Sequence, residues 1–155
     1  MADPGVLVRV AEGDDLDAVA RLRWTWRVDR GEVPTTDLAA FTAALRAWAE
    51  DHASTHVPFV AVVDGAVVGM AWQAIVERIP GPEVWTRRSG MVQSVYVDPA
   101  VRDRGIGTEL VAALVDAARA AELSYLAVHP TERAMPFYRR LGFAEYERAL
   151  ELRFS

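Results

Sequence analysis

A chain of 155 residues with 52% hydrophobic content is long enough for one compact core but short for two, so we expect a single domain over 1–155. It has no cysteine, and all 17 basic residues are arginine, which excludes disulfide frameworks, zinc–cysteine sites, Schiff-base lysines and P-loop lysines. The formal net charge of −5 argues against broad electrostatic attraction to nucleic acid, and we expect no such partner.

Membrane and metal sites also lack sequence support. No apolar stretch reaches the roughly 20 residues of a membrane span, and the N-terminus shows no basic-then-apolar leader. We therefore expect a cytoplasmic protein with no membrane partner. The histidines His52, His56 and His129 form no HExxH motif, so no metal site is expected.

The N-terminal third predicts one strand and two helices. Residues 6–10 form a short apolar strand, and Asp14 or Asp15 is placed to cap the helix that follows, in which apolar residues recur at helical spacing. After a break at Pro34, residues 37–49 predict a second helix with one apolar face.

The middle of the chain predicts a β-hairpin followed by a separate strand. Residues 59–63 and 66–75 are joined by Asp64-Gly65, a pair that readily adopts the positive φ angles of a tight turn. Prolines and glycine in residues 79–82 mark a loop. Residues 91–97 then resume as an apolar strand that stops before a proline.

The remaining chain alternates helix and strand. Apolar positions every four residues predict a buried helix face over 105–121, and this helix connects the strand at 91–97 to the next strand at 125–128. Such a crossover places the two strands parallel. A short helix from Thr131 to Leu141, ended by Gly142 in a left-handed cap, and a last strand at 143–154 complete the chain. The order predicts an α/β (α+β) fold with a mixed sheet.

The connection between the strand at 91–97 and its helix has the features of an anion site. Two glycines, Gly105 and Gly107, stand at the helix start, where unpaired N–H groups carry partial positive charge and a phosphate can approach closely. Arg102 and Arg104 add positive charge. From the glycine pair alone, an ordinary strand-to-helix connection is the favoured explanation. The third glycine and the acidic residue of a dinucleotide-binding motif are absent.

Taken whole, the segment Val-Tyr-Val-Asp-Pro followed by Arg-x-x-Gly-x-Gly resembles the acyl-CoA signature of the GNAT superfamily of N-acetyltransferases. A second block in family order, Ala134 to Phe143, is similar to the family's later motif, with its Phe-Tyr pair and closing Gly-Phe. The resemblance implies a small bacterial member with a mixed sheet of six to seven strands and about four helices. It also implies that the strands at 91–97 and 125–128 diverge.

Family resemblance further implies a function and a cofactor site. Acetyl-CoA would donate its acetyl group directly to a primary amine of an unidentified small molecule or peptide, and the enzyme would form a homodimer. Tyr138 matches the tyrosine assigned as general acid to the departing thiolate, and a phenol is protonated at neutral pH, as that role requires. The implied cofactor contacts are Val95, Tyr96, Val97, Arg102, Asp103, Arg104, Gly105, Ile106, Gly107, Thr108 and Thr131.

The general base and the acceptor site stay open. Some members carry a base at the positions of Met91 and Gln93, and neither residue can act as one here. His129, Glu77, Glu83 or a water chain are the alternatives, and the two glutamates read equally well as solvated loop charges. The acceptor candidates are Trp24, Arg27, Glu32, Trp72, Glu77 and Glu83, with the tryptophans also explained as core or subunit contacts. A catalytically weak acyl-CoA-binding sensor or regulatory module of the same fold is the alternative function.

Overall fold

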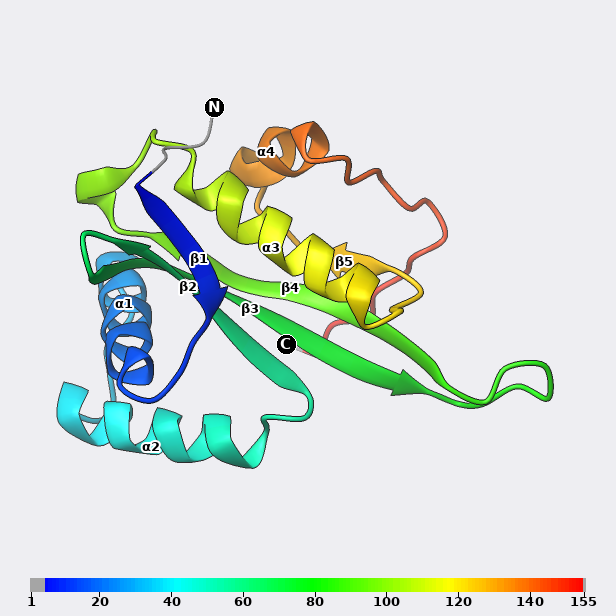
Figure 1. Ribbon diagram of the computed structural model, residues 1–155, viewed down its shortest axis with the longest axis horizontal. Helices are drawn as coiled ribbons and strands as arrows, with labels where there is room; N and C mark the ends of the chain where they lie inside the picture. The colour runs from blue at the N-terminus through cyan, green and yellow to red at the C-terminus, as the bar shows by residue number, and fades with distance from the viewer. Residues whose placement is uncertain (1–4, 155) are drawn as a thin grey trace.

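A computed structural model describes residues 5–154 of the chain (Figure 1). Within these residues one mixed sheet, of order β1-β2-β3-β4-β5, lies between two layers of helices. The elements are β1 Val6–Val10, α1 Asp15–Asp29, α2 Leu38–Asp51, β2 His56–Val63, β3 Ala66–Arg78, β4 Arg87–Val97, η1 Pro99–Val101, α3 Ile106–Ala120, β5 Leu126–Val128, η2 Glu132–Ala134 and α4 Met135–Arg140. None of the helices in this part of the chain has the length and apolar character of a membrane span.

Each face of the sheet has its own apolar core. Figure 1 shows α3 lying across the strands, with α1 and α2 beyond the opposite face. The α3 side chains pack against Phe59 and Ala71, whereas α1 packs against Val60 and Met70. Neighbouring residues of one strand thus serve opposite cores, because strand side chains alternate between the two faces. Each large apolar side chain buried in this way contributes about 1.5–3 kcal/mol.

The predicted strand directions are confirmed. β2 and β3 pair antiparallel across Asp64 and Gly65, whose φ angles of 49° and 77° are those of the predicted turn. β4 and β5 run parallel, from Gly90 opposite Leu126 to Val92 opposite Val128. The predicted α3 face is also confirmed, since Leu110 and Leu114 have no exposed surface.

A buried polar contact fixes α3 on the sheet. Gln73 of β3 is 2% exposed, and its Nε2 donates a hydrogen bond of 3.0 Å to the carbonyl oxygen of Leu114. Near the end of α3, Arg88 of β4 donates to the carbonyl of Ala121 at 2.6 Å. These bonds satisfy polar groups where the middle and the end of α3 lie against the sheet.

The chain departs from prediction at two places. The strand predicted at 143–154 is wrong: this segment contains no strand, so the described residues form five strands rather than six to seven. Leu150 and Leu152 are exposed, and the short β5 ends the sheet. Of the two predicted caps of α1, Asp14 occupies the N-cap position but makes no capping hydrogen bond, and its carboxylate lies 3.5 Å from Arg46. Asp15 is the first residue of the helix, and its Oδ2 accepts a 2.8 Å hydrogen bond from the Glu12 N–H.

Candidate active site

β4 contains a bulge that changes its course. Register passes from Trp72 opposite Gln93 to Met70 opposite Tyr96, so two residues of β4 face the single residue Ala71. The first of the two, Ser94, has a φ of 56°, which is uncommon for a residue other than glycine. A bulge of this kind bends the strand and ends regular pairing.

The bulge reverses the facing of the strand. Val92 packs in the α3 core, and simple alternation would put residue 96 on the same face. Instead Tyr96 packs in the α1 core, while Val95 and Val97 lie against the α3 core. Nothing in the sequence marks Ser94 as a bulge, and alternation alone gives the wrong face for Tyr96.

β4 and β5 separate directly before the bulge. Their pairing stops at Val92 and Val128, and within residues 5–154 no strand accompanies β4 on that side from Gln93 onward. The predicted divergence is therefore present. An open strand edge of this kind offers backbone N–H and C=O groups to an extended ligand. On this segment the carbonyl oxygen of Val97 accepts a 3.0 Å hydrogen bond from Nε of Arg102.

The chain next forms the start of α3. Asp103 and Gly105 both have left-handed φ angles, 65° and 77°, and Gly105 is the N-cap, with no side-chain capping bond. Backbone bonding of the helix begins with Glu109 N–H donating to the Gly105 carbonyl at 3.1 Å. The N–H groups of residues 106–108 precede that bond, which makes this end a favourable place for an anion.

Both predicted sequence blocks meet at Gly107. A β-carbon on Gly107 would lie 3.6 Å from Cζ of Phe137 in α4 and 4.0 Å from Cγ2 of Val97 in β4. The helix start, the open strand and the Phe-Tyr pair are therefore neighbours. Thr131 lies at the beginning of η2, three residues after β5 ends, and its side chain makes no capping bond.

Tyr138 of α4 is held in the α3 core. It is 8% exposed, and its ring packs edge-on against Phe137 at 5.0 Å and Phe143 at 5.4 Å. Burial raises the pKa of the Tyr138 phenol above its usual value of 10. The hydroxyl is therefore protonated throughout the neutral range.

Tyr96 and Arg102 form a second pair beside the bulge. The Arg102 guanidinium lies 5.4 Å from the centre of the Tyr96 ring, so this side chain folds back over β4. The Tyr96 ring stacks on Trp26 of α1, and its buried hydroxyl has no hydrogen-bond partner in the described structure. Burial is the main cause that raises the pKa of this phenol.

Three of the predicted acceptor residues line one pocket of about 280 Å³ at the end of α1 and the loop to α2. Trp24 lies 5.8 Å from Phe41 of α2, ring centre to ring centre, and Arg27 forms a 2.5 Å ion pair with Glu32. The lining residues are Arg23, Trp24, Arg27, Glu32, Val33, Pro34, Thr35, Thr36 and Phe41.

Arg23 connects this pocket to the bulge, and the sequence prediction missed it. Its Nη1 donates a 2.6 Å hydrogen bond to Oγ of Ser94. The available signal was its spacing from Arg27, because residues four apart share one face of a helix.

Other predicted acceptor and base residues are not brought to this pocket. Trp72 is 6% exposed within the α1 core. Glu77 pairs with Arg88, six positions before Ser94, which corresponds to about 20 Å along a strand. Glu83 is exposed in the segment between β3 and β4. This segment forms the projecting end of the hairpin in Figure 1. Of the base candidates, His129 is exposed just beyond β5.

Comparison of the sequence with known protein families identifies the family of this chain. Residues 16–143 match the model of the acetyltransferase (GNAT) family. The chain belongs to the GNAT family. A curated relative, glucosamine 6-phosphate N-acetyltransferase of Trypanosoma brucei brucei, is 33% identical over 66 residues, which cover 43% of this chain and 45% of that protein. The match thus spans less than half of the relative's length.

Solved structures share the GNAT fold over nearly the whole chain. An acetyltransferase of Trypanosoma brucei is 26% identical with a TM-score of 0.76, covering 96% of this chain and 99% of that one. A predicted acetyltransferase of Clostridium acetobutylicum, solved with acetyl-CoA, is 22% identical with a TM-score of 0.75 and 96% coverage of each chain.

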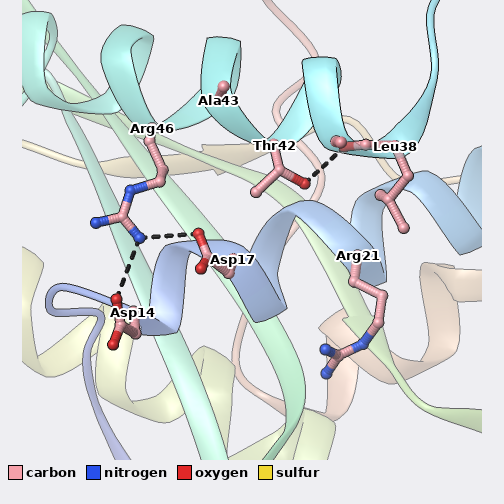
Figure 2. Close-up of a pocket in the computed structure, with 8 residues that line it drawn as sticks. Asp14, Asp17, Arg21, Leu38, Thr42, Ala43 and Arg46 are labelled. Atoms are coloured by element: carbon pink, nitrogen blue, oxygen red, sulfur yellow. Dashed lines mark hydrogen bonds and ion pairs between the residues drawn. The ribbon is translucent and has the colours of Figure 1, made fainter.

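A larger hollow of about 510 Å³ lies elsewhere on the GNAT chain, between the outer surfaces of α1 and α2. Figure 2 shows Arg46 reaching from α2 toward Asp14 and Asp17 of α1, at 3.5 and 2.8 Å. Its lining includes no residue of β4, β5, α3 or α4. We therefore assign it to the packing of the two helices rather than to the active site.

Proposed function

We propose that this GNAT chain is an acetyl-CoA-dependent N-acetyltransferase that transfers the acetyl group directly to a primary amine. The observation that carries the proposal is the departure of β4 from β5 at the Ser94 bulge, immediately before the uncapped start of α3. An open strand edge and an anion site, adjoining through Gly107, suit a ligand with an extended amide-containing arm and a pyrophosphate.

The residues present fit that cofactor. N–H groups of residues 106–108 would hold the pyrophosphate, and the backbones of Val95 and Val97 would bind the arm. Because residue 107 is glycine, no side chain stands between Val97 and Phe137, and the cofactor could approach the backbone there. Tyr96, Arg102, Asp103, Arg104, Gly105 and Thr131 complete the proposed contact set. When bound, acetyl-CoA supplies an acetyl group activated as a thioester.

The chain's own groups would assist the transfer in two ways. A backbone N–H of the bulged strand would donate to the acetyl oxygen as negative charge develops there, a contribution worth about 3–4 kcal/mol in comparable sites. Tyr138 would hold the proton needed by the leaving sulfur, and burial keeps that phenol protonated. Met91 and Gln93, at the positions where some family members carry a base, cannot accept the proton, so we assign removal of the amine proton to water.

We test the cofactor first. Acetyl-CoA is titrated calorimetrically into the wild type and into Gly105→Glu, whose added side chain would occupy and repel the pyrophosphate site. Gly105 has a φ of 77°, so any side chain there strains the backbone. Gly105→Ala is therefore the matched control for strain. We expect saturable binding in the wild type, weakened binding in Gly105→Ala and none in Gly105→Glu.

An amine screen that follows release of free CoA thiol then tests turnover. Glucosamine 6-phosphate belongs in the screen because the curated relative is named for it, alongside amino acids, polyamines and peptides. CoA release with one of these amines supports the enzyme. Binding without release for any amine supports the sensor or regulatory module instead, and absence of binding contradicts both.

A further inference from the structure

We propose that Arg23 binds an anionic group of the acceptor, so that the substrate is a small primary amine carrying a carboxylate or a phosphate. This inference rests on the proposed N-acetyltransferase function and names its substrate class. It follows from the contacts of Arg23, the charges around it and the size and position of its pocket.

Arg23 is a half-buried cation without a carboxylate partner. Its Nη1 donates to the neutral hydroxyl of Ser94, and within residues 5–154 no carboxylate lies at ion-pair distance from it. Burial and then the charge of Arg27 lower the pKa of the Arg23 guanidinium, the charge of Glu32 raises it, and the arginine stays protonated. A cation held away from water in this way gains from an anionic ligand.

The surrounding charges leave the pocket positive. Arg27 lies one helical turn from Arg23, and its guanidinium is committed to Glu32 at 2.5 Å. Two arginines and one glutamate are the charged residues that line the pocket. The net excess of one positive charge is therefore located at Arg23, where the guanidinium fork matches a carboxylate or phosphate.

The remaining lining favours a small polar ligand. The volume of about 280 Å³ is near the lower end for ligand pockets. Trp24 and Phe41 supply an aromatic wall, while Thr35 and Thr36 bring hydroxyl groups. An amine about the size of an amino acid or a monosaccharide fits these dimensions.

Position ties the pocket to the reaction. Arg23 lines the pocket and also touches Ser94, the residue at which β4 leaves its regular course. A ligand anchored by its anion at Arg23 would therefore extend its amine along the bulge toward the open strand edge. Binding energy at a distant anion would in this way orient the nucleophile.

Paired amines test the inference by release of CoA thiol. Phosphoethanolamine is compared with ethanolamine for the phosphate arm, and phenylalanine with phenylalaninamide for the carboxylate arm. We expect kcat/KM to be at least about tenfold higher for the anionic member of at least one pair, as one charge-assisted hydrogen bond allows. The arm that shows the preference identifies the anion.

Three variants separate the guanidinium from its surroundings. Arg23→Gln should remove most of the preference, chiefly through KM, and lower turnover of the neutral amines far less. Arg21→Gln makes the same change of charge on α1 outside this pocket and should keep the preference. Ser94→Ala removes the hydrogen bond but leaves the cation, so it should also keep the preference.

The outcomes test this inference separately from the proposed N-acetyltransferase function on which it rests. The inference is overturned if the wild type turns over both members of each pair with equal kcat/KM. It is also overturned if Arg23→Gln lowers kcat/KM equally for the anionic and the neutral amine. Either result leaves the proposed acetyltransferase function unchanged. If no amine releases CoA, the proposed function fails, and NMR titrations of the arginine Nε–H signals with phosphoethanolamine and, separately, with phenylalanine decide the inference. A change in chemical shift that is absent in Arg23→Gln supports the inference. No change in the wild type with either ligand overturns it.

Discussion

At the residue scale, Tyr138 combines two roles in one side chain. Its ring packs against Phe137 and Phe143, whereas its hydroxyl is the proposed proton donor. Tyr138→Phe keeps the ring and removes the proton. We expect kcat to fall by about 100-fold, as for loss of a general acid. Calorimetry should give an unchanged dissociation constant for acetyl-CoA; an unchanged kcat would contradict the assignment.

His56 makes the free energy of unfolding depend on pH. It borders Trp48 and His52, and burial, followed by the charge of His52, lowers its pKa below the usual 6.5. As pH falls below 6.5 the unfolded chain takes up the proton first, so the folded state loses stability until the folded pKa is passed. Urea unfolding at pH 5 and pH 7.5 should show a smaller loss for His56→Gln than for the wild type.

Residues with a strong local pattern could be predicted, and those defined by their surroundings could not. The left-handed conformation of Gly142 follows from a glycine directly after the end of a helix. Arg23 carries no such signal, since its importance comes from a contact with Ser94, 71 positions away. Long-range contacts of this kind need the fold before they can be recognised.

At the scale of elements, prediction succeeded where apolar periodicity decides and failed where backbone pairing decides. The apolar face of α3 is confirmed residue by residue. β3 and β4 extend beyond the predicted limits because polar residues such as Glu77 and Arg88 continue the ladder. Backbone groups make that ladder, so side-chain hydrophobicity does not reveal its end.

Contact between β4 and β5 depends on Gly90. A β-carbon there would lie 2.8 Å from Cδ1 of Leu123 and 3.0 Å from Cδ1 of Leu126. We expect Gly90→Ala to lower the free energy of unfolding by up to about 1 kcal/mol, because the crowded atoms are the ends of two leucine side chains, which can move aside. The measurement is urea denaturation of each variant beside the wild type.

Gly107→Ala is the matched control for this change. Its β-carbon would meet Phe137 at 3.6 Å, an ordinary contact, in the first turn of α3. Stability should stay the same or rise by up to about 1 kcal/mol, since alanine favours helix over glycine. Equal losses in both variants would show that the crowding at Gly90 is not what matters.

At the scale of the whole molecule, the C-terminal segment is outside both cores. Leu150, Leu152 and Phe154 are 99%, 78% and 85% exposed, and the segment forms no strand. Replacing all three with serine should change the free energy of unfolding by less than about 0.5 kcal/mol. Leu114→Ala, at a position with no exposed surface, should cost about 2–5 kcal/mol in the same assay.

Oligomeric state is a second property of the whole molecule that the same triple variant addresses. The homodimer stays a prediction from the family resemblance. Light scattering of the wild type and the triple serine variant measures the mass directly. A dimer that becomes a monomer only in the variant would place the subunit contact at the C-terminal segment.

The bulge at Ser94 inserts one extra residue into β4, so the alternation of side chains between the two faces differs before and after it. Before it, Val92 belongs to the α3 core; after it, that core receives Val95 and Val97. Deleting Ser94 would restore regular alternation, with Val95 and Val97 still facing α3 and Tyr96 still facing α1, but it would remove the bend of the strand and the hydrogen bond to Arg23. The extra residue therefore sets the course of the active-site end of β4 and its contact with α1, rather than the faces of the neighbouring side chains.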